Sequence, residues 1–597
     1  MIAELGEFLI WCPSDVSEAS WPKTAGLLPW PITAELRTAE VEGRAYLAWM
    51  GGIERGEDVD GGLQLTGGRE LPGGDSDAVR HPVGARASVD GRGRIRAACD
   101  PMRLAPLYYG HGSWGWGVAT DLRLLAALPG VPDEISLEAI YHLMNFACIP
   151  TPHTIYAGLR KLPPGSRVRL DGSGVELTRY WQPAYPEDLD LPESELVEET
   201  KSRITEAVAA VAGADQPLGT FLSGGTDSSA ITGILAQHYR PGTLKAFSIG
   251  FDLDGFDELQ YARDAATEFG VEHHVRTLGP DDVLASVPVL LRCFDEPFAN
   301  SSAVASYYCA ALAAEEGCTL MVAGDGGDEI FGGNERYAKD FWFSLYHDLP
   351  RPLRRMGRLT HRLLAPVDNR LANRLKNFLY RGDLANPERF YTDDAFASEF
   401  YEEMLTRRFR GEVALDASID VLRGHYDASG ARSELNRLLY MDLQVAIADN
   451  DLMKVNRSAR GSGVSVAYPY LSPRLVAYMG RVPARHKVRG ARKRYLYKKA
   501  VAHVLPQSIR NKRKQGMGMP LGQWFRTEAA VRDWLRDVLL SRRALERDYF
   551  EPGFVERLLE RHLSGVWDYC QELWTLVMLE LWQEHRKDRR RVQQDAA

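Results

Sequence analysis

A short segment rich in glycine and serine carries the residue types that bind a phosphate chain. Residues 223–229 read Ser-Gly-Gly-Thr-Asp-Ser-Ser and lie between an apolar run and a stretch with helical spacing. Glycines let backbone N–H groups approach an anion, and a helix N-terminus adds donors and the positive end of its dipole. Asp227 alone would repel phosphate, so we expect it to hold Mg²⁺ against the phosphates. The segment predicts a site for the pyrophosphate part of ATP.

A second acidic loop follows a later apolar run. Residues 324–329 read Gly-Asp-Gly-Gly-Asp-Glu. In a parallel sheet, the loops at the carboxyl ends of the strands face one crevice. We therefore expect Asp328 to meet the same Mg²⁺ as Asp227, and Asp325 to face the reacting groups.

The elements that must position these loops alternate between strand and helix. This alternation predicts a parallel α/β sheet, and from about residue 335 the spacing of Leu, Tyr and Trp predicts helices. We expect strands at 218–222, 244–251, 273–278 and 319–324, and helices at 227–239, 257–269, 281–294 and 303–316. Short apolar runs between Gly-rich turns make the first part of the chain β-rich, and a stretch rich in proline and acid follows it. The predicted units are a domain at 1–182, a linker at 183–196 and a second domain at 197–597.

Composition limits the classes of protein that remain. The chain has 597 residues, ordinary hydrophobic content (45%) and a net charge of -9, which favour several globular domains and argue against nucleic acid as a partner. Its seven cysteines form no CxxC pair, which indicates neither a zinc site nor a disulfide framework. No secretory signal is evident, and no run reaches the ~18 apolar residues of a membrane helix. We expect a cytoplasmic protein without a membrane partner.

The two loops, in this order, resemble those of the PP-loop ATP pyrophosphatases and, more narrowly, of the asparagine synthetase family. The likeness extends over most of the chain and includes Leu162-Pro-Pro-Gly-Ser, Arg179-Tyr-Trp and Lys514-Gln-Gly-Met-Gly-Met-Pro. It implies an α/β fold in which a glutaminase-like (Ntn-type) αββα domain precedes a PP-loop α/β synthetase domain with a helical extension. It also implies ATP and Mg²⁺, with Asp227 and Asp328 as metal ligands. The implied ATP-binding residues are Phe221, Ser223, Gly224, Gly225, Asp227, Ser228, Ser229, Ile249, Ala323 and Gly324.

The N-terminal domain departs from the family pattern. Glutamine-using members carry a nucleophilic cysteine directly after the initiator methionine, where this chain has Ile2. The family's Asp-Arg-x-Gly turn is Asp-Pro-Met-Arg at 100–103. The resemblance therefore implies a degenerate glutaminase domain without the nucleophile, and the amine must come from elsewhere.

The acceptor side departs as well. Asparagine synthetases carry Glu, Arg and Asp where this chain has Ser465, Ala467 and Ser472, which implies a larger or less charged acyl substrate. A family lysine that steadies the reacting charges corresponds to Arg494 or, with a slip of one residue, to Lys493. Either cation could stabilise the negative charge that develops during attack on the acyl group.

These features predict a ligase that forms a carbon–nitrogen bond. ATP would convert a carboxylate into an acyl-adenylate, an amine would displace AMP, and Asp325 would take the proton of the amine. Family members without the cysteine mostly close rings with the substrate's own amine, as lasso-peptide macrolactam synthetases and β-lactam synthetases do. The chain length and Asp325, where the β-lactam type has a tyrosine, favour the lasso type. Its partners would be a precursor peptide, a leader-binding recognition protein and a leader peptidase. An ammonia-dependent asparagine synthetase and a non-catalytic scaffold remain open.

Overall fold

The computed structural model describes residues 2–3, 6–14, 35–42, 44–51, 53–57, 62–67, 84–213, 216–253, 259–367, 369–512 and 518–596. The start of the helix expected from residue 257 and most of the 514–520 motif lie outside these ranges. None of the described helices is long and apolar enough to cross a membrane.

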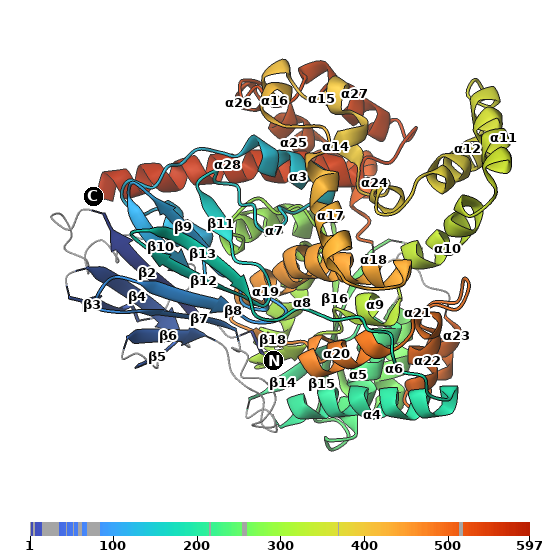
Figure 1. The fold of residues 1–597 in the computed structure, drawn as a ribbon, viewed down its shortest axis with the longest axis horizontal. Helices are drawn as coiled ribbons and strands as arrows, with labels where there is room; N and C mark the ends of the chain where they lie inside the picture. Colours follow the sequence, from blue (N-terminus) through green and yellow to red (C-terminus); the bar gives the residue numbers. More distant parts are fainter. Residues whose placement is uncertain are drawn as a thin grey trace.

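The N-terminal domain is a sandwich of two antiparallel sheets (Figure 1). The first sheet has the order β11-β9-β10-β2-β4-β3. Its strands are β2 Gly6–Pro13, β3 Arg37–Val41, β4 Ala45–Gly51, β9 Tyr108–Gly112, β10 Gly115–Ala119 and β11 Leu159–Lys161. The second sheet has the order β13-β12-β8-β7-β6-β5. Its strands are β5 Glu54–Glu57, β6 Leu63–Gly67, β7 Ala85–Val89, β8 Ile95–Cys99, β12 Ser166–Asp171 and β13 Gly174–Arg179.

Alternation of side chains explains how the sandwich forms. On β2, Phe8 and Ile10 point into the core between the sheets, whereas Leu9 and Trp11 join a core shared with the helices. That helical layer consists of α2 Leu122–Ala126 and α3 Leu137–Phe146. The resemblance implies four layers in the order α, β, β and α. The described residues form both sheets and the helical layer on one side of them.

The second domain is built on the predicted parallel sheet. Four predicted strands are observed as β14 Leu218–Phe221, β15 Lys245–Phe251, β16 Glu272–Leu278 and β17 Leu320–Val322. The helices between them are α5 Thr226–Ala236, α6 Leu259–Phe269, α7 Pro280–Cys293 and α8 Ala303–Glu315. Parallel pairing of β14 with both β15 and β17 confirms the predicted α/β arrangement and brings the two loops to one edge.

The observed sheet contains two strands that the sequence did not predict. The sheet order is β1-β18-β17-β14-β15-β16, where β18 is Ser465–Ala467 and β1 is Ile2–Ala3. β18 runs parallel to β17, and β1 pairs with it in the antiparallel sense. Residues 2–3 therefore belong to the sheet of the second domain, whereas the predicted boundary places residues 1–182 in the first domain. In addition, α4 (Glu193–Ala212) begins inside the segment predicted as a linker.

Helices dominate after β17, as expected. The helices from α9 to α16 are α9 Gly327–Phe331, α10 Glu335–His347, α11 Arg351–Leu363, α12 Arg370–Asp383, α13 Glu388–Tyr391, α14 Phe396–Glu399, α15 Tyr401–Met404 and α16 Arg407–Glu412. The next group is α17 Ala417–Ala428, α18 Glu434–Asp442, α19 Leu452–Arg460, α20 Pro473–Arg481, α21 Ala484–Lys487 and α22 Tyr495–Ala500. The last group is α23 Gln507–Asn511, α24 Leu521–Thr527, α25 Ala529–Leu539, α26 Arg542–Leu545, α27 Pro552–Leu563 and α28 Cys570–Ala596. A π-helix, Leu443–Asp451, joins α18 to α19.

Candidate active site

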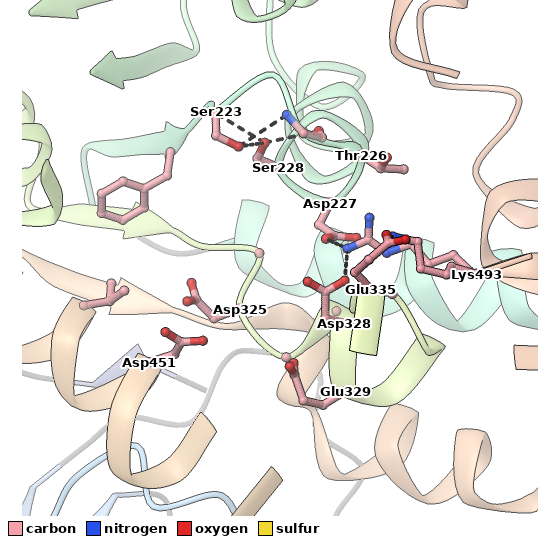
Figure 2. Close-up of a pocket in the computed structure, with 18 of the residues that line it drawn as sticks. Ser223, Thr226, Asp227, Ser228, Asp325, Asp328, Glu329, Glu335, Asp451 and Lys493 are labelled. Carbon is pink, nitrogen blue, oxygen red and sulfur yellow. Dashed lines mark hydrogen bonds and ion pairs between the residues drawn. The ribbon is translucent and has the colours of Figure 1, made fainter. Parts of the chain in front are cut away.

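The first predicted loop is held in shape by its own hydroxyl groups. The Ser223 N–H donates to Ser228 Oγ at 3.2 Å, and the two serine Oγ atoms lie 3.0 Å apart (Figure 2). Gly224 has a φ of +69°, and a Cβ there would lie 2.8 Å from the backbone nitrogen of Ala262 on α6. Gly225 is the N-cap of α5, whose first turn contains Asp227. The loop therefore aims a helix N-terminus and a carboxylate at one region.

Glycines bring the second loop against the first. A Cβ on Gly327 would lie 2.9 Å from Cγ of Asp227, and a Cβ on Gly324 would lie 3.2 Å from its Cβ. Gly326, at a φ of +88°, gives the left-handed turn before α9 and packs against Leu471. Larger residues at 324 and 327 would push the loops apart, so these glycines permit their contact.

Arg494 links the two acids that the sequence assigns to a metal. Its Nη2 atom forms ion pairs with Oδ2 of Asp227 and Oδ1 of Asp328. Burial by itself would lower the pKa of Arg494, but these two carboxylates raise it above its ordinary value. Arg494 has a left-handed φ of 52°, and its N–H donates to the carbonyl of Gly332. The neighbouring Lys493 forms an ion pair with Glu335 instead.

The donor chemistry of this pair fits a hard cation. Asp227 and Asp328 lie close enough to share one guanidinium group, and carboxylate oxygens are the ligands that Mg²⁺ prefers. For both Oδ atoms to bind Mg²⁺, Arg494 would have to release them. The assignment of Asp227 and Asp328 as metal ligands stays a prediction.

The opposite wall of the site is also acidic. The carboxyl groups of Asp325 and Asp451 lie side by side in Figure 2, and Lys454 Nζ donates to Asp451 Oδ1 at 2.6 Å. Burial raises the pKa of Asp325 to about 6, although the positive charge of Lys454 acts to lower it. Burial and the neighbouring Asp328 raise the pKa of Glu329 well above its ordinary value. Such a group of acids suits the binding of a cation or an amine.

The loops and this wall enclose a cavity of about 830 Å³. The predicted site residues that line it are Phe221, Ser223, Gly225, Asp227, Ser228, Gly324, Asp325, Asp328, Lys493 and Arg494. Four further predicted residues are not among the lining residues: Gly224, Ser229, Ile249 and Ala323. Ser229 and Ala323 are buried in the protein interior, and Ile249 packs on the core from β15. Their roles toward ATP stay predictions.

Several lining residues were not singled out from the sequence: Thr226, Glu329, Asp451, Lys454, Lys498 and Lys512. For two of them the sequence held a signal, because Asp451 and Lys454 lie in the segment 449–457, which resembles the asparagine synthetase family. The π-helix ends at Asp451, and α19 carries Lys454 on its first turn. Irregular helix of this kind is frequent at functional sites.

The N-terminal domain supports this wall directly. Arg103, in the altered 100–103 turn, forms a fully buried ion pair with Asp449. Asp449 also accepts hydrogen bonds from the N–H and Oγ1 of Thr151, each at 2.7 Å. Asp449 precedes Asp451 by two residues, so the first domain fixes the backbone that presents the acidic wall.

The first domain offers no reactive thiol. Its three cysteines are Cys12, Cys99 and Cys148, and all are buried. Burial raises the pKa of Cys12 to about 12 and raises the pKa values of the other two well above the ordinary range. A thiol protonated at neutral pH is a poor nucleophile.

The changed acceptor residues lie elsewhere than the sequence suggests. Ser465 and Ala467 belong to β18, where both are buried. Neither these residues nor Ser472 are among those that line the cavity. Their lost charges therefore give no direct information on what the described cavity binds.

Comparisons with known proteins match both domains. The profile of the Asparagine synthase family matches residues 199–584, and that of a glutamine amidotransferase domain matches residues 89–181. Asparagine synthetase [glutamine-hydrolyzing] 1 of Bacillus subtilis is 26% identical over 491 residues, which cover 82% of this chain and 75% of that protein. A putative asparagine synthetase [glutamine-hydrolyzing] of Mycobacterium tuberculosis is 28% identical, covering 81% and 73%. Amidase chyE of Penicillium rubens is 27% identical over 42% of this chain and 40% of its own. The predicted fold class is confirmed, with both domains in the expected order.

Proposed function

Because the chain belongs to the asparagine synthase family, and is thus an ATP-dependent ligase that forms amide bonds, we propose that it closes a macrolactam ring in a peptide. The acyl group is the side-chain carboxyl of an Asp or Glu residue, and the amine is the N-terminus of the same peptide. This reaction corresponds to that of a lasso-peptide cyclase.

The observation that carries the proposal is the lack of a usable thiol in the glutaminase-like domain. Ammonia from glutamine requires a nucleophile, and the three cysteines there are buried and protonated. The amine must then come from a source other than glutamine, and in this proposal it belongs to the substrate. Ring closure meets this requirement because both reacting groups belong to one molecule, which removes the entropic cost of assembling two.

Activation of the carboxyl group uses the first loop. The backbone N–H groups at the start of α5 bind the phosphates, and a carboxylate oxygen of the peptide attacks the α-phosphorus of ATP. Pyrophosphate leaves and an acyl-adenylate forms. Mg²⁺, held by Asp227 and Asp328, supplies charge screening when bound. Arg494 lies beside both acids and, together with Lys493 at the rim, offsets negative charge on the phosphates.

Amide formation uses the acidic wall. Asp325 and Asp451 attract the terminal amine, and ionised Asp325 accepts its proton as the nitrogen attacks the acyl carbon. The carbon–nitrogen bond forms, the bond from the acyl carbon to the AMP oxygen breaks, and AMP leaves. Lys454 steadies Asp451 during this step.

Three partners follow from the proposal. The substrate is a precursor peptide, which a leader-binding recognition protein presents and a leader peptidase trims. We propose that these steps occur in the cytoplasm, where ATP is abundant.

Mass spectrometry tests the proposal. The protein is incubated with ATP, Mg²⁺ and a candidate core peptide, and we expect AMP together with a product lighter by one water that resists carboxypeptidase. The Asp227→Ala variant should form neither. AMP formation with aspartate and ammonia, or with a small β-amino acid, but with no peptide would overturn ring closure in peptides.

Asparagine formation is a second candidate, because the relatives are named asparagine synthetases. Those names specify glutamine as the nitrogen source, but without a usable thiol the nitrogen would come from ammonia. Ser465 and Ala467 are buried and do not line the cavity, which also weakens the argument against a small acceptor. Complementation of an asparagine auxotroph on ammonium would support this candidate, whereas a failure to grow with well-expressed protein would exclude it.

A further inference from the structure

Three helices, α10, α11 and α12, form a basic arm (residues 335–383). In Figure 1, α11 and α12 project from the body of the molecule on the side away from the β-sandwich. Between residues 335 and 383 the sequence has eleven arginines or lysines and five aspartates or glutamates, and between 351 and 383 it has nine and two, in a chain whose net charge is -9. The arm is thus strongly basic on an acidic protein.

The arm has its own inner packing. Phe343 and Tyr346 of α10 pack their rings against Phe378 of α12. Gly357 of α11 faces Tyr346, since a Cβ there would clash with its hydroxyl group. Arg358 forms an ion pair with Asp383 at 2.9 Å. These ring contacts and this ion pair hold the three helices together. Other apolar side chains of the arm take no part in them and are exposed.

Those outer side chains form an apolar stripe, each between 48% and 69% exposed. The stripe consists of Trp342, Leu345, Leu353, Met356, Leu359 and Leu363. On α11 the apolar residues occupy one face at helical spacing, and none of its residues is buried. Exposed apolar surface of this extent on a charged protein marks an interaction site.

Helix α10, which carries the first residues of the stripe, begins beside the active site. Glu335, the first residue of α10, lines the cavity and pairs with Lys493. A Cβ on Gly490 would lie 3.9 Å from the ring of Phe341, which places this part of α10 against the segment that leads to Lys493 and Arg494. From there α10 runs outward for about 20 Å. A ligand on the arm would be anchored next to the cavity rim.

We propose that the basic arm is a docking surface for an acidic, amphipathic polypeptide that presents the substrate peptide to the cavity. Apolar side chains of the ligand cover the stripe, and its carboxylates meet Arg351, Arg355 and Arg362, which are exposed along α11. The role in presentation rests on the proposed function, whereas the binding itself does not.

Two other occupants fit less well. A second copy that placed arm on arm would oppose like charges. An anionic membrane would suit the charge, because basic amphipathic helices lie on membrane surfaces. Binding to a bilayer would not use the start of α10 at the cavity rim, beside Lys493, so a polypeptide accounts for more of the structure.

Fluorescence anisotropy with the full-length protein tests this surface. The probe is a labelled peptide with leucines at helical spacing and glutamates between them, and the comparison peptide has lysines in place of the glutamates. We expect the acidic peptide to bind in a salt-sensitive manner and the basic peptide not to bind. The L353S/M356S/L359S variant and the R351Q/R355Q/R362Q variant should each bind at least about tenfold more weakly.

The matched control is V175S/L177S, which removes exposed apolar side chains from β13 and should bind the peptide as the parent protein does. Thermal melting checks that each variant is folded. Equal binding of the acidic peptide by parent and arm variants, or no binding, would overturn the proposal. So would arm-dependent binding to phosphatidylglycerol vesicles without peptide binding, or arm-dependent self-association in sedimentation.

The assay contains no ATP, so its result is independent of amide synthesis. Arm-dependent peptide binding without ring formation would remove the proposed function and leave a docking surface. Ring formation without arm-dependent binding would remove the docking surface alone.

Discussion

At the scale of single residues, the environment of Asp325 decides how it serves as a base. Burial raises its pKa to about 6, and Lys454 limits that rise. An acid must be ionised to accept a proton, so activity should fall as the pH drops through about 6. The Lys454→Met variant lacks the positive charge that lowers the pKa of Asp325, so this pKa should rise further. The acidic limb of the plot of kcat against pH should then move to higher pH.

Kinetics over a pH series measure this shift, with Lys201→Met on the exposed face of α4 as the control. An acidic limb at the same pH in Lys454→Met and the parent protein would show that Asp325 is not the titrating base.

Arg494 provides a second residue-scale prediction. Its guanidinium group competes with Mg²⁺ for the carboxylates of Asp227 and Asp328. Without ATP, Mg²⁺ should therefore raise the Tm of Arg494→Ala more than that of the parent protein, because ligand binding to the folded state stabilises it. Differential scanning fluorimetry measures the shift. Asp227→Ala should lose it, and the absence of any Mg²⁺ effect in Arg494→Ala would argue against a metal on this pair.

At the scale of elements, the phosphate loop depends on how closely it approaches α6. Gly224→Ala meets both a left-handed φ and a contact at 2.8 Å with the backbone of Ala262. Gly242 has a similar φ of +79° but no atom within 4 Å of a built Cβ. We expect Gly224→Ala to weaken ATP binding at least about tenfold, since the loop must shift, and Gly242→Ala to leave it unchanged.

Isothermal titration with ATP, read beside the Tm of each variant, separates the two effects. Both substitutions share the cost of the left-handed backbone, so only Gly224→Ala tests the close approach. Equal ATP affinities in the two variants would mean that the loop shape does not control binding.

At the scale of the whole molecule, the N-terminal domain holds the active-site wall in place. Arg103 and Asp449 form an ion pair with both side chains fully buried. Arg103→Met leaves the charge of Asp449 buried without its partner, which should destabilise the protein by about 3–5 kcal/mol. Urea unfolding measures the loss. Arg103→Met combined with Asp449→Leu should recover part of it, and a loss below about 1 kcal/mol for Arg103→Met would contradict this role.

The C-terminal helix also packs on the N-terminal domain. Helix α28 lies over the N-terminal domain in Figure 1, where Trp582 packs against Tyr156 and Arg586 pairs with Asp133 at 3.1 Å. Trp582 is among the largest fully buried side chains. This contact shows that the N-terminal domain also has a structural role, because its residues share one hydrophobic core with the synthetase domain.

Local patterns predicted much of the sheet and the loops. Apolar runs ending in Gly-rich or acidic turns identified β14 and β17 together with their loops, because buried parallel strands are continuous in hydrophobicity. The same reasoning missed β18, since Ser465–Ala467 is only three residues long and its burial comes from neighbours in the fold. It also did not single out Asp451, because a resemblance of the segment 449–457 to the family does not say which of its side chains face the cavity.

The sequence by itself determined the family, the order of the two domains, the phosphate loop and the absence of a cysteine at position 2, because these depend on residue types at short spacing. Only the tertiary structure decided that Arg494 lies between Asp227 and Asp328, that Arg103 supports Asp449, and that Ser465 and Ala467 do not line the cavity. Each of these contacts joins residues far apart in the chain, where side-chain packing and charge pairing determine the neighbours. No spacing rule along the sequence contains that information.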